Sequence, residues 1–173
     1  MSKIILLIGR KKSGKTTKAK EVVQRLVLMG LPPIVYDTNN EYKDLELVEV
    51  ENVKPNCRII TEDTQAAISA ISRLSKVTFV MEDATIWLSG NIADLSLKRL
   101  IITCRHRQIA SVFIFHSLNR VPNFLYEQSD LIYLFKTKEN NATWAKFRDD
   151  DLKAAHFEVM NHESKHYYKT IRT

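Results

Sequence analysis

The stretch that decides the fold is Gly9-Arg10-Lys11-Lys12-Ser13-Gly14-Lys15-Thr16. It has the spacing GxxxxGK[ST], in which the two glycines let the backbone curl so that its amides face an anion. In such a loop the lysine, here Lys15, brings a cation to the β- and γ-phosphates of a nucleotide, and the hydroxyl of Thr16 reaches Mg²⁺. The stretch therefore predicts a site for ATP and magnesium near the start of the chain.

The residues on either side of this loop fit the same interpretation. Residues 4–8 are a continuous apolar run, which is typical of a strand buried on both faces of a sheet. Residues 15–29 carry apolar side chains with helical periodicity, and the positive N-terminal end of that helix would point at the phosphates. The alternative, a lysine-rich turn, explains neither flank. We expect the nucleotide to contact Gly9, Lys12, Ser13, Gly14, Lys15, Thr16 and Thr17.

Further apolar runs alternate with helical patterns along the chain. We expect strands at 34–37, 58–60, 77–81, 112–115 and 131–135, and helices at 64–75 and 95–104. Strands that alternate with helices imply a mainly parallel sheet covered on both faces. Residues 157–160 and 167–171 have the pattern of a C-terminal β-hairpin. The predicted fold class is an α/β P-loop NTPase, with residues 1–173 as a single domain.

Composition sets limits on partners and location. The 173 residues carry a formal net charge of +6, which permits a polyanionic partner such as nucleic acid. Phosphate-binding lysines account for part of that excess. No apolar run approaches the ~20 residues of a membrane span, and the first residues lack a signal-peptide pattern. Cys57 and Cys104 stand far apart in the sequence, without a CxxC pattern, which favours a reducing compartment. We expect a cytoplasmic protein without a membrane partner.

A second acidic site follows the apolar run at 77–81, where Glu82 and Asp83 stand side by side. Taken alone, two acids there would be a strand end and a helix cap. Next to a P-loop, two such acids indicate a catalytic site, because NTPases of this kind hold Mg²⁺ with one carboxylate and polarise the attacking water with another acid. We assign Glu82, together with Thr16, to the metal shell, and Asp83 to the activation of water.

Four stretches resemble the FtsK–HerA group of P-loop motor ATPases, especially its small viral genome-packaging members and the Zot-like ATPases. They are GRKKSGKTT (9–17), VYDTNNEY (35–42), TFVMEDA (78–84) and CRHRQIASVFIFHSLNRVP (104–122). The resemblance implies a RecA-like sheet and a homo-oligomeric ring that moves double- or single-stranded DNA. It also implies capsid or portal-vertex proteins as possible partners, and a location in the host cytoplasm or the virion.

The last stretch carries the catalytic roles that the resemblance implies. Arg105 would act in trans as an arginine finger, with Arg107 and Arg99 as rivals, and His116 or Ser117 would sense the γ-phosphate. Two features depart from the group, which usually has Asp-Glu in place of Glu-Asp and glutamine at the sensor position. From the residues alone, a basic side chain at this junction is more often a helix C-terminal charge.

Polar residues after the second strand leave two interpretations open. Asp37, Asn39, Asn40 and Glu41 would lie at the carboxyl edge of a parallel sheet, where nucleotides bind. The same residues are also typical of a plain polar turn. We include Asp37 among the expected nucleotide-binding residues.

One motif predicts chemistry that its context argues against. His162-Glu163-Ser164-Lys165-His166 matches HExxH, which binds zinc only when both histidines share a helix face. The flanking residues have strand character, so we expect a turn rather than a zinc site.

The function predicted from all of these features is that of an oligomeric, ATP-driven DNA translocase, namely a viral genome-packaging ATPase. The alternative is a P-loop kinase of small molecules, in which Arg105 and Arg107 would be lid arginines. A kinase requires a phosphate acceptor and can work as a monomer. A translocase requires only water, assembles, and responds to DNA.

Overall fold

The computed structural model describes residues 3–88, 95–139 and 149–173. In chain order the first half contains β1 (Ile4–Ile8), α1 (Lys15–Leu28), β2 (Pro33–Tyr36), β3 (Glu46–Leu47), η1 (Val50–Asn52), β4 (Cys57–Ile59), α2 (Thr64–Ser72) and β5 (Thr78–Met81). The second half contains α3 (Ala84–Trp87), α4 (Leu95–Arg107), β6 (Ala110–Phe115), η2 (Leu118–Arg120), α5 (Asn123–Glu127), β7 (Leu131–Phe135), α6 (Asp150–Asn161) and β8 (Tyr168–Arg172). Within these ranges, no helix is both long and apolar enough to cross a bilayer.

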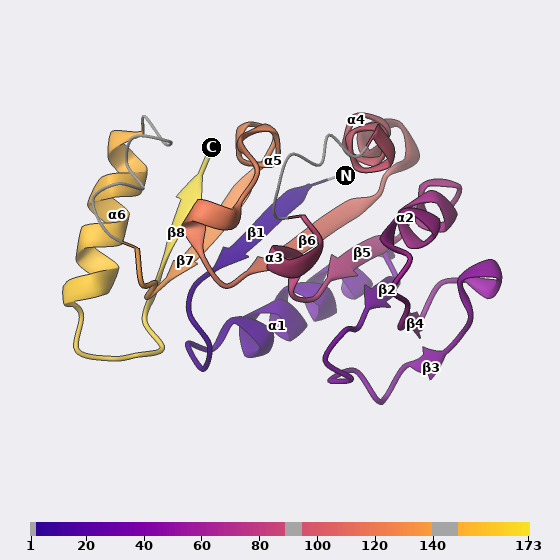
Figure 1. Cartoon of the computed structure of the whole chain (residues 1–173), viewed down its shortest axis with the longest axis horizontal. Helices are drawn as coiled ribbons and strands as arrows, with labels where there is room; N and C mark the ends of the chain where they lie inside the picture. Colours follow the sequence, from indigo (N-terminus) through magenta and orange to yellow (C-terminus); the bar gives the residue numbers. More distant parts are fainter. Residues whose placement is uncertain (1–2, 89–94, 140–148) are drawn as a thin grey trace.

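A single sheet organises the molecule (Figure 1). Within the described residues it has eight strands in the order β3-β4-β2-β5-β6-β1-β7-β8. Every neighbouring pair is parallel except β7 and β8, which run antiparallel. β1 lies between β6 and β7, so the strand that leads into the P-loop is central. This confirms the predicted α/β fold with a mainly parallel sheet.

Both faces of the sheet are covered, because successive side chains of a strand point to opposite faces. On one face, Val22 and Leu26 of α1 pack with Ile5 and Leu7 of β1. On the other face, residues of α2, α4 and α6 pack with Ile4, Leu6 and Ile8 of the same strand. Figure 1 shows α1 on one side of the strands and α2 and α4 on the other. All five residues of β1 are buried, as the continuous apolar run predicted.

The C-terminal region corrects one expectation. Residues 157–160 are not a strand but the last turns of α6, so their pairing with 167–171 was wrong. The helix begins after Asp149, whose side chain accepts a hydrogen bond from the Leu152 amide, and it buries Leu152, Ala155 and Val159 at helical spacing. The expected terminal antiparallel pair does form, but β8 pairs with β7.

Parallel strands give the sheet two chemically different edges. The carboxyl ends of β1, β2, β5 and β6 meet at one edge, which we call the carboxyl edge, and the chain continues there into Gly9, Asp37, Glu82 and His116. At the opposite or amino edge, the amide of Lys76 donates to the carbonyl of Arg107, and the amide of Ser111 donates to that of Lys3. Because β1 spans five residues at ~3.3 Å each, the two edges are about 16 Å apart.

Candidate functional site

The P-loop leaves β1 through a close contact that only glycine allows. A Cβ on Gly9 would lie 2.5 Å from the Cβ of Phe135. The Gly9 amide donates to the carbonyl of Phe115, and the Arg10 amide donates to that of Lys136, so both neighbouring strands hold the start of the loop. Further along, Lys12 and Gly14 have φ angles of 62° and 96°. Left-handed residues in such a turn direct successive amides to one side, which makes an anion-binding nest.

Lys15 lies inside this loop at the first residue of α1. Its side chain is nearly buried, and its Nζ donates to the carbonyl of Arg10 at 2.8 Å. Burial lowers the pKa of Lys15 to about 8, against the opposing attraction of Glu82 and Asp83. The lysine is thus held beneath the loop with few water contacts. When it is protonated, it can form a strong charge-assisted hydrogen bond to a phosphate.

Glu82 and Asp83 follow β5 directly and face the same space. Glu82 is 2% exposed, accepts a hydrogen bond from the hydroxyl of Tyr42 at 3.0 Å, and has its pKa raised to about 7, chiefly by burial. Asp83 has a φ of 47°, and its Oδ2 lies 3.4 Å from Nε2 of His116. The two acids are therefore neighbours in different environments. Such a difference is required if one carboxylate is to hold the metal and the other to activate water.

Unsatisfied polar atoms test whether nucleotide and magnesium fit here. Ser13 Oγ, Asp83 Oδ1 and His116 Nδ1 are buried without a hydrogen-bond partner within the part of the chain that the structure describes. Such groups are costly unless a ligand or water satisfies them. A phosphate accepts from the serine, and hydrated Mg²⁺ donates to the carboxylate. The donor set therefore fits a magnesium–nucleotide complex.

One cavity of about 550 Å³ joins these elements. The predicted residues that line it are Lys12, Gly14, Lys15, Thr16, Thr17, Glu82, Asp83 and His116. Asn39 and Glu41 from the turn after β2 line it as well. Its volume is in the range of small-molecule sites. Residues that are far apart in the sequence thus line one binding space.

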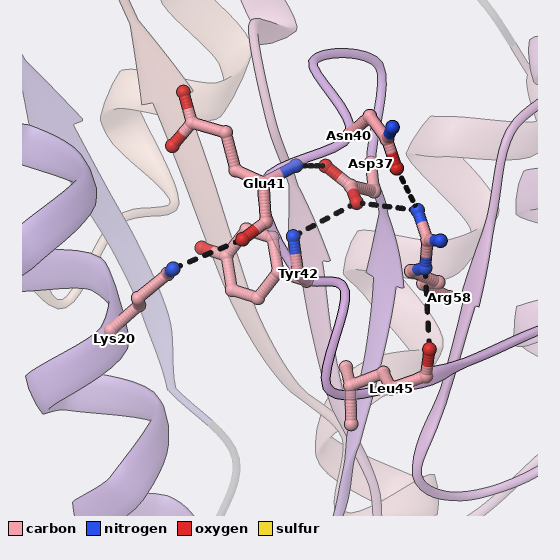
Figure 2. Close-up of polar contacts among 7 residues, drawn as sticks. All are labelled: Lys20, Asp37, Asn40, Glu41, Tyr42, Leu45 and Arg58. Atoms are coloured by element: carbon pink, nitrogen blue, oxygen red, sulfur yellow. Dashed lines mark hydrogen bonds and ion pairs between the residues drawn. The ribbon is translucent and has the colours of Figure 1, made fainter.

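Asp37 holds the turn that forms one wall of this cavity (Figure 2). Its carboxylate accepts from the amides of Glu41 and Tyr42 at 2.8 and 3.0 Å, and it pairs with Arg58 Nη1 at 3.2 Å. Arg58 also donates to Asn40 Oδ1 and to the carbonyl of Leu45.

The consequence of this network is the placement of Tyr42, whose hydroxyl holds Glu82. Asp37 is fully buried, and it is not among the residues that line the cavity. The turn interpretation thus describes its contacts, and direct contact with nucleotide stays a prediction. Lys20 fixes the same turn from α1 through the carbonyl of Glu41 at 3.1 Å.

The two sensor candidates have different surroundings. The His116 amide donates to Thr85 Oγ1 at 2.7 Å, and its ring lies beside Asp83 at the cavity. The hydroxyl of Ser117 donates to Glu139 at 2.5 Å instead, and it lines a neighbouring hollow. Of the two, His116 is the residue that the structure places at the cavity.

Arg105 and its rivals lie on α4, away from the cavity of their own chain. Arg105 and Arg107 are exposed in the last turn of the helix, at the amino edge. Arg107 donates from Nη1 to the carbonyl of Arg73 at 2.9 Å. Arg99 is exposed earlier on the same helix. None of the three lines the cavity in this chain, so a catalytic role for Arg105 depends on a neighbouring subunit and stays a prediction.

Two residues that the sequence reasoning missed come from the HExxH stretch. Helix α6 ends at Asn161, so His162 and His166 lie in a turn and do not share a helix face. Lys165 and His166 line the cavity. The signal for them is topological: because β8 runs antiparallel to β7, the residues before it lie at the carboxyl edge.

Comparisons with known proteins identify the fold. No family model matches the sequence, and no curated protein matches it. Among solved structures, the genome packaging NTPase B204 from Sulfolobus turreted icosahedral virus 2 in complex with sulfate matches with a TM-score of 0.82 and 19% identity, over 99% of this chain and 91% of that chain.

Two further structures agree. The complex of the same NTPase with ATP-gammaS has a TM-score of 0.81 at 19% identity, over 99% of this chain and 92% of that one. The DNA-packaging ATPase B204 from Sulfolobus Turreted Icosahedral Virus has a TM-score of 0.77 at 18% identity, over 98% and 92%. At this level of identity the likeness is one of fold, and it confirms the predicted resemblance to viral packaging ATPases at that level.

Proposed function

We propose that this chain is an ATP-hydrolysing, oligomeric DNA translocase that packages a viral genome. The observation that carries the proposal is the single cavity in which Lys15 of the P-loop meets Glu82 and Asp83. The fold around that cavity is that of solved viral packaging NTPases, one of which was determined in complex with ATP-gammaS and in complex with AMPPCP. Both the geometry and the fold therefore favour a nucleotide as the ligand.

The side chains divide the chemistry among them. The loop amides, the N-terminus of α1 and Lys15 bind the phosphates. Thr16 and Glu82 would hold Mg²⁺, whose charge offsets that of the β- and γ-phosphates. Asp83 accepts the proton of the attacking water, and His116 beside it orients the carboxylate. Tyr42 keeps Glu82 in place from the other side.

The surface at the amino edge supports the DNA-binding part of the proposal. Its exposed cations include Arg73, Lys76, Arg105 and Arg107. None of them takes part in the seven ion pairs of the described residues. Unpaired cations on one surface suit either a phosphate backbone or the active site of a neighbouring subunit in a ring. We assign Arg105 to the neighbour's site and the others to DNA.

The remaining parts of the proposal concern partners and place. A packaging motor would work as a homo-oligomeric ring on double- or single-stranded DNA, against capsid or portal-vertex proteins. It would do so in the host cytoplasm or in the virion.

The experiment that tests the proposal measures ATP hydrolysis with and without double-stranded DNA, alongside the mass of the protein in solution. We expect an oligomer whose hydrolysis is stimulated by DNA, with DNA affinity that falls steeply with salt and shows little sequence preference. A monomer that ignores DNA and transfers phosphate to a small acceptor would establish the kinase alternative instead.

A further inference from the structure

A second hollow adjoins the phosphate cavity along α1. It has a volume of about 360 Å³ and shares Gly14, Thr17 and His166 with the first cavity. Phe135 and Tyr168 complete its aromatic wall. A ligand anchored by phosphates at the P-loop can therefore extend past Gly14 into this hollow without leaving the protein surface.

The wall of this hollow has the chemistry that a flat aromatic group requires. The rings of Phe135 and Tyr168 lie 5.0 Å apart between centroids. Lys18 of α1 places its Nζ 4.9 Å from the centroid of the Tyr168 ring, a cation–π contact that helps to fix the ring. His166 is exposed at the junction with the phosphate cavity. Planar bases stack on surfaces of this kind.

Two other hollows beside the phosphate cavity, both lined by described residues, lack such a surface. One, of about 430 Å³, is lined by polar and charged residues that include Arg10, Lys138 and Glu139. Another, of about 560 Å³, is lined by Lys20, Glu21 and other polar residues of α1. Neither has an aromatic ring other than the imidazole of His116 in its lining. Of these three hollows among the described residues, the aromatic hollow is therefore the one suited to a base.

The segment that carries His166 is ordered by its own contacts. Lys136 Nζ donates to the carbonyl of His162, and the ring of His162 stacks on Tyr167 at 3.7 Å. The Ser164 amide donates to His162 Nδ1 at 3.1 Å, and the His166 amide donates to Ser164 Oγ at 3.2 Å. These contacts hold the turn in a position in which Lys165 and His166 line the cavity.

We propose that the aromatic hollow is the nucleobase subsite, in which the base stacks against His166 and Tyr168 while Lys165 reaches toward the phosphates. This inference rests on the proposed function, since it takes a nucleoside triphosphate as the ligand. It gives the HExxH stretch a role unrelated to zinc: the C-terminal turn binds the end of the nucleotide that the P-loop does not.

The test compares ATP with inorganic tripolyphosphate, which has the phosphates but no base, by calorimetry on the full chain with Mg²⁺. The His166→Ala and Tyr168→Leu variants should bind ATP about 5- to 150-fold more weakly, which is the range for one stacked base. Their affinity for tripolyphosphate should be unchanged. Glu163→Ala, an exposed position in the same turn that lines neither hollow, is the matched control and should bind both probes as the parent does.

The outcomes separate this inference from the function on which it rests. If the parent protein binds tripolyphosphate as tightly as ATP, the base is not bound and the subsite is wrong, while the phosphate site stands. Unchanged ATP affinity in His166→Ala, whose exposed side chain is not part of the core, also overturns it. A parent that binds neither probe overturns the proposed function and the subsite together.

Discussion

The two edges of the sheet carry charge in opposite ways. At the carboxyl edge, Lys15, Glu82 and Asp83 are 4%, 2% and 7% exposed, and burial brings the pKa of Lys15 down to about 8 and that of Glu82 up to about 7. At the amino edge, Arg105 and Arg107 are exposed and form no ion pair with the carboxylates of the described residues.

This difference in the burial of charge indicates different roles for the two edges. Burying charges around a cavity costs free energy of folding, and groups with shifted pKa values concentrate at active sites. Exposed cations cost little and remain available to a partner. The carboxyl edge therefore has the properties of a reaction site, and the amino edge those of a contact surface.

The largest expected effect tests whether the two edges meet between subunits. Arg105→Ala should lower the turnover of ATP by about 10³- to 10⁵-fold, which is the range for an arginine finger. Its affinity for ATP should stay nearly normal, because a finger acts on transition-state charge. Steady-state hydrolysis and equilibrium nucleotide binding measure the two quantities. Arg73→Ala, on the same edge, is the control and should lose DNA affinity only.

Subunit mixing then shows whether Arg105 acts in trans. On the proposed roles, Asp83→Asn would lack the water-activating acid of its own site but would keep Arg105. In mixed oligomers, some interfaces pair an intact Asp83 with an intact Arg105 of the neighbour, and those sites should recover activity. No recovery in mixed oligomers confirmed by mass would favour Arg107 or Arg99. Normal basal turnover of Arg105→Ala with lost DNA stimulation would make Arg105 a DNA contact.

The next effect separates the two acids of the carboxyl edge. Asp83→Asn should bind ATP and turn it over about 10²- to 10⁴-fold more slowly, as expected for the loss of a general base. Glu82→Gln should in addition require more Mg²⁺ for nucleotide binding. Magnesium titrations of both variants measure this difference. Equal binding defects would mean that the two acids do not divide the roles in this way, and normal hydrolysis by Asp83→Asn would exclude Asp83 as the activating acid.

A smaller effect concerns the buried cation. Lys15→Ala should keep its fold but lose about 10- to 150-fold in affinity for ATP, the range for hydrogen bonds to charged groups. Calorimetry with circular dichroism measures binding and folding on the same samples. Lys43→Ala, exposed on the turn after β2 and outside the cavity, should bind ATP normally. Unchanged affinity in a folded Lys15→Ala protein would rule out the site.

The sequence was sufficient for the features that depend on local spacing. The P-loop and the acids after β5 are contiguous patterns beside buried strands, so the sequence alone pointed to Lys15, Glu82 and Asp83, and the structure brings these three residues to one cavity. The parallel sheet followed from the alternation of elements. Residues 157–160 misled because four residues that mix polar and apolar side chains fit a strand as well as a helix turn, and the buried spacing becomes visible only from Leu152 onward.

The residues that the sequence did not reveal depend on which elements become neighbours. Tyr42 reaches Glu82 across 40 positions only because β2 pairs with β5 and Asp37 folds the intervening turn. His166 reaches Gly14 only because β8 pairs antiparallel with β7, beside the P-loop. Neither contact has a periodic or motif signal, so both became apparent from the tertiary arrangement.

The smallest effect measures what the buried carboxylate costs. Burial raises the pKa of Glu82 to about 7 from an ordinary value of 4.5. Between these values the folded state binds more protons than the unfolded state, so this group lowers the free energy of unfolding as pH rises. The gap between the two values corresponds to about 3 kcal/mol. Lys15, with a pKa of about 8, stays largely protonated below pH 7.5. Of these two groups, it is therefore Glu82 that changes the free energy of unfolding between pH 4.5 and pH 7.

Glu82→Gln should therefore be more stable than the parent at pH 7.5, with a difference that shrinks toward pH 5. The amide oxygen of glutamine can still accept the hydrogen bond from Tyr42, so the substitution removes the charge and keeps the contact. Denaturant unfolding without metal or nucleotide, at several pH values, measures the profile. Glu62→Gln, an exposed carboxylate, and Arg105→Ala at the amino edge should both run parallel to the parent. If the free energy of unfolding of Glu82→Gln follows the same pH profile as the parent, burial of the Glu82 charge does not destabilise the protein. The two edges would then not differ in this respect.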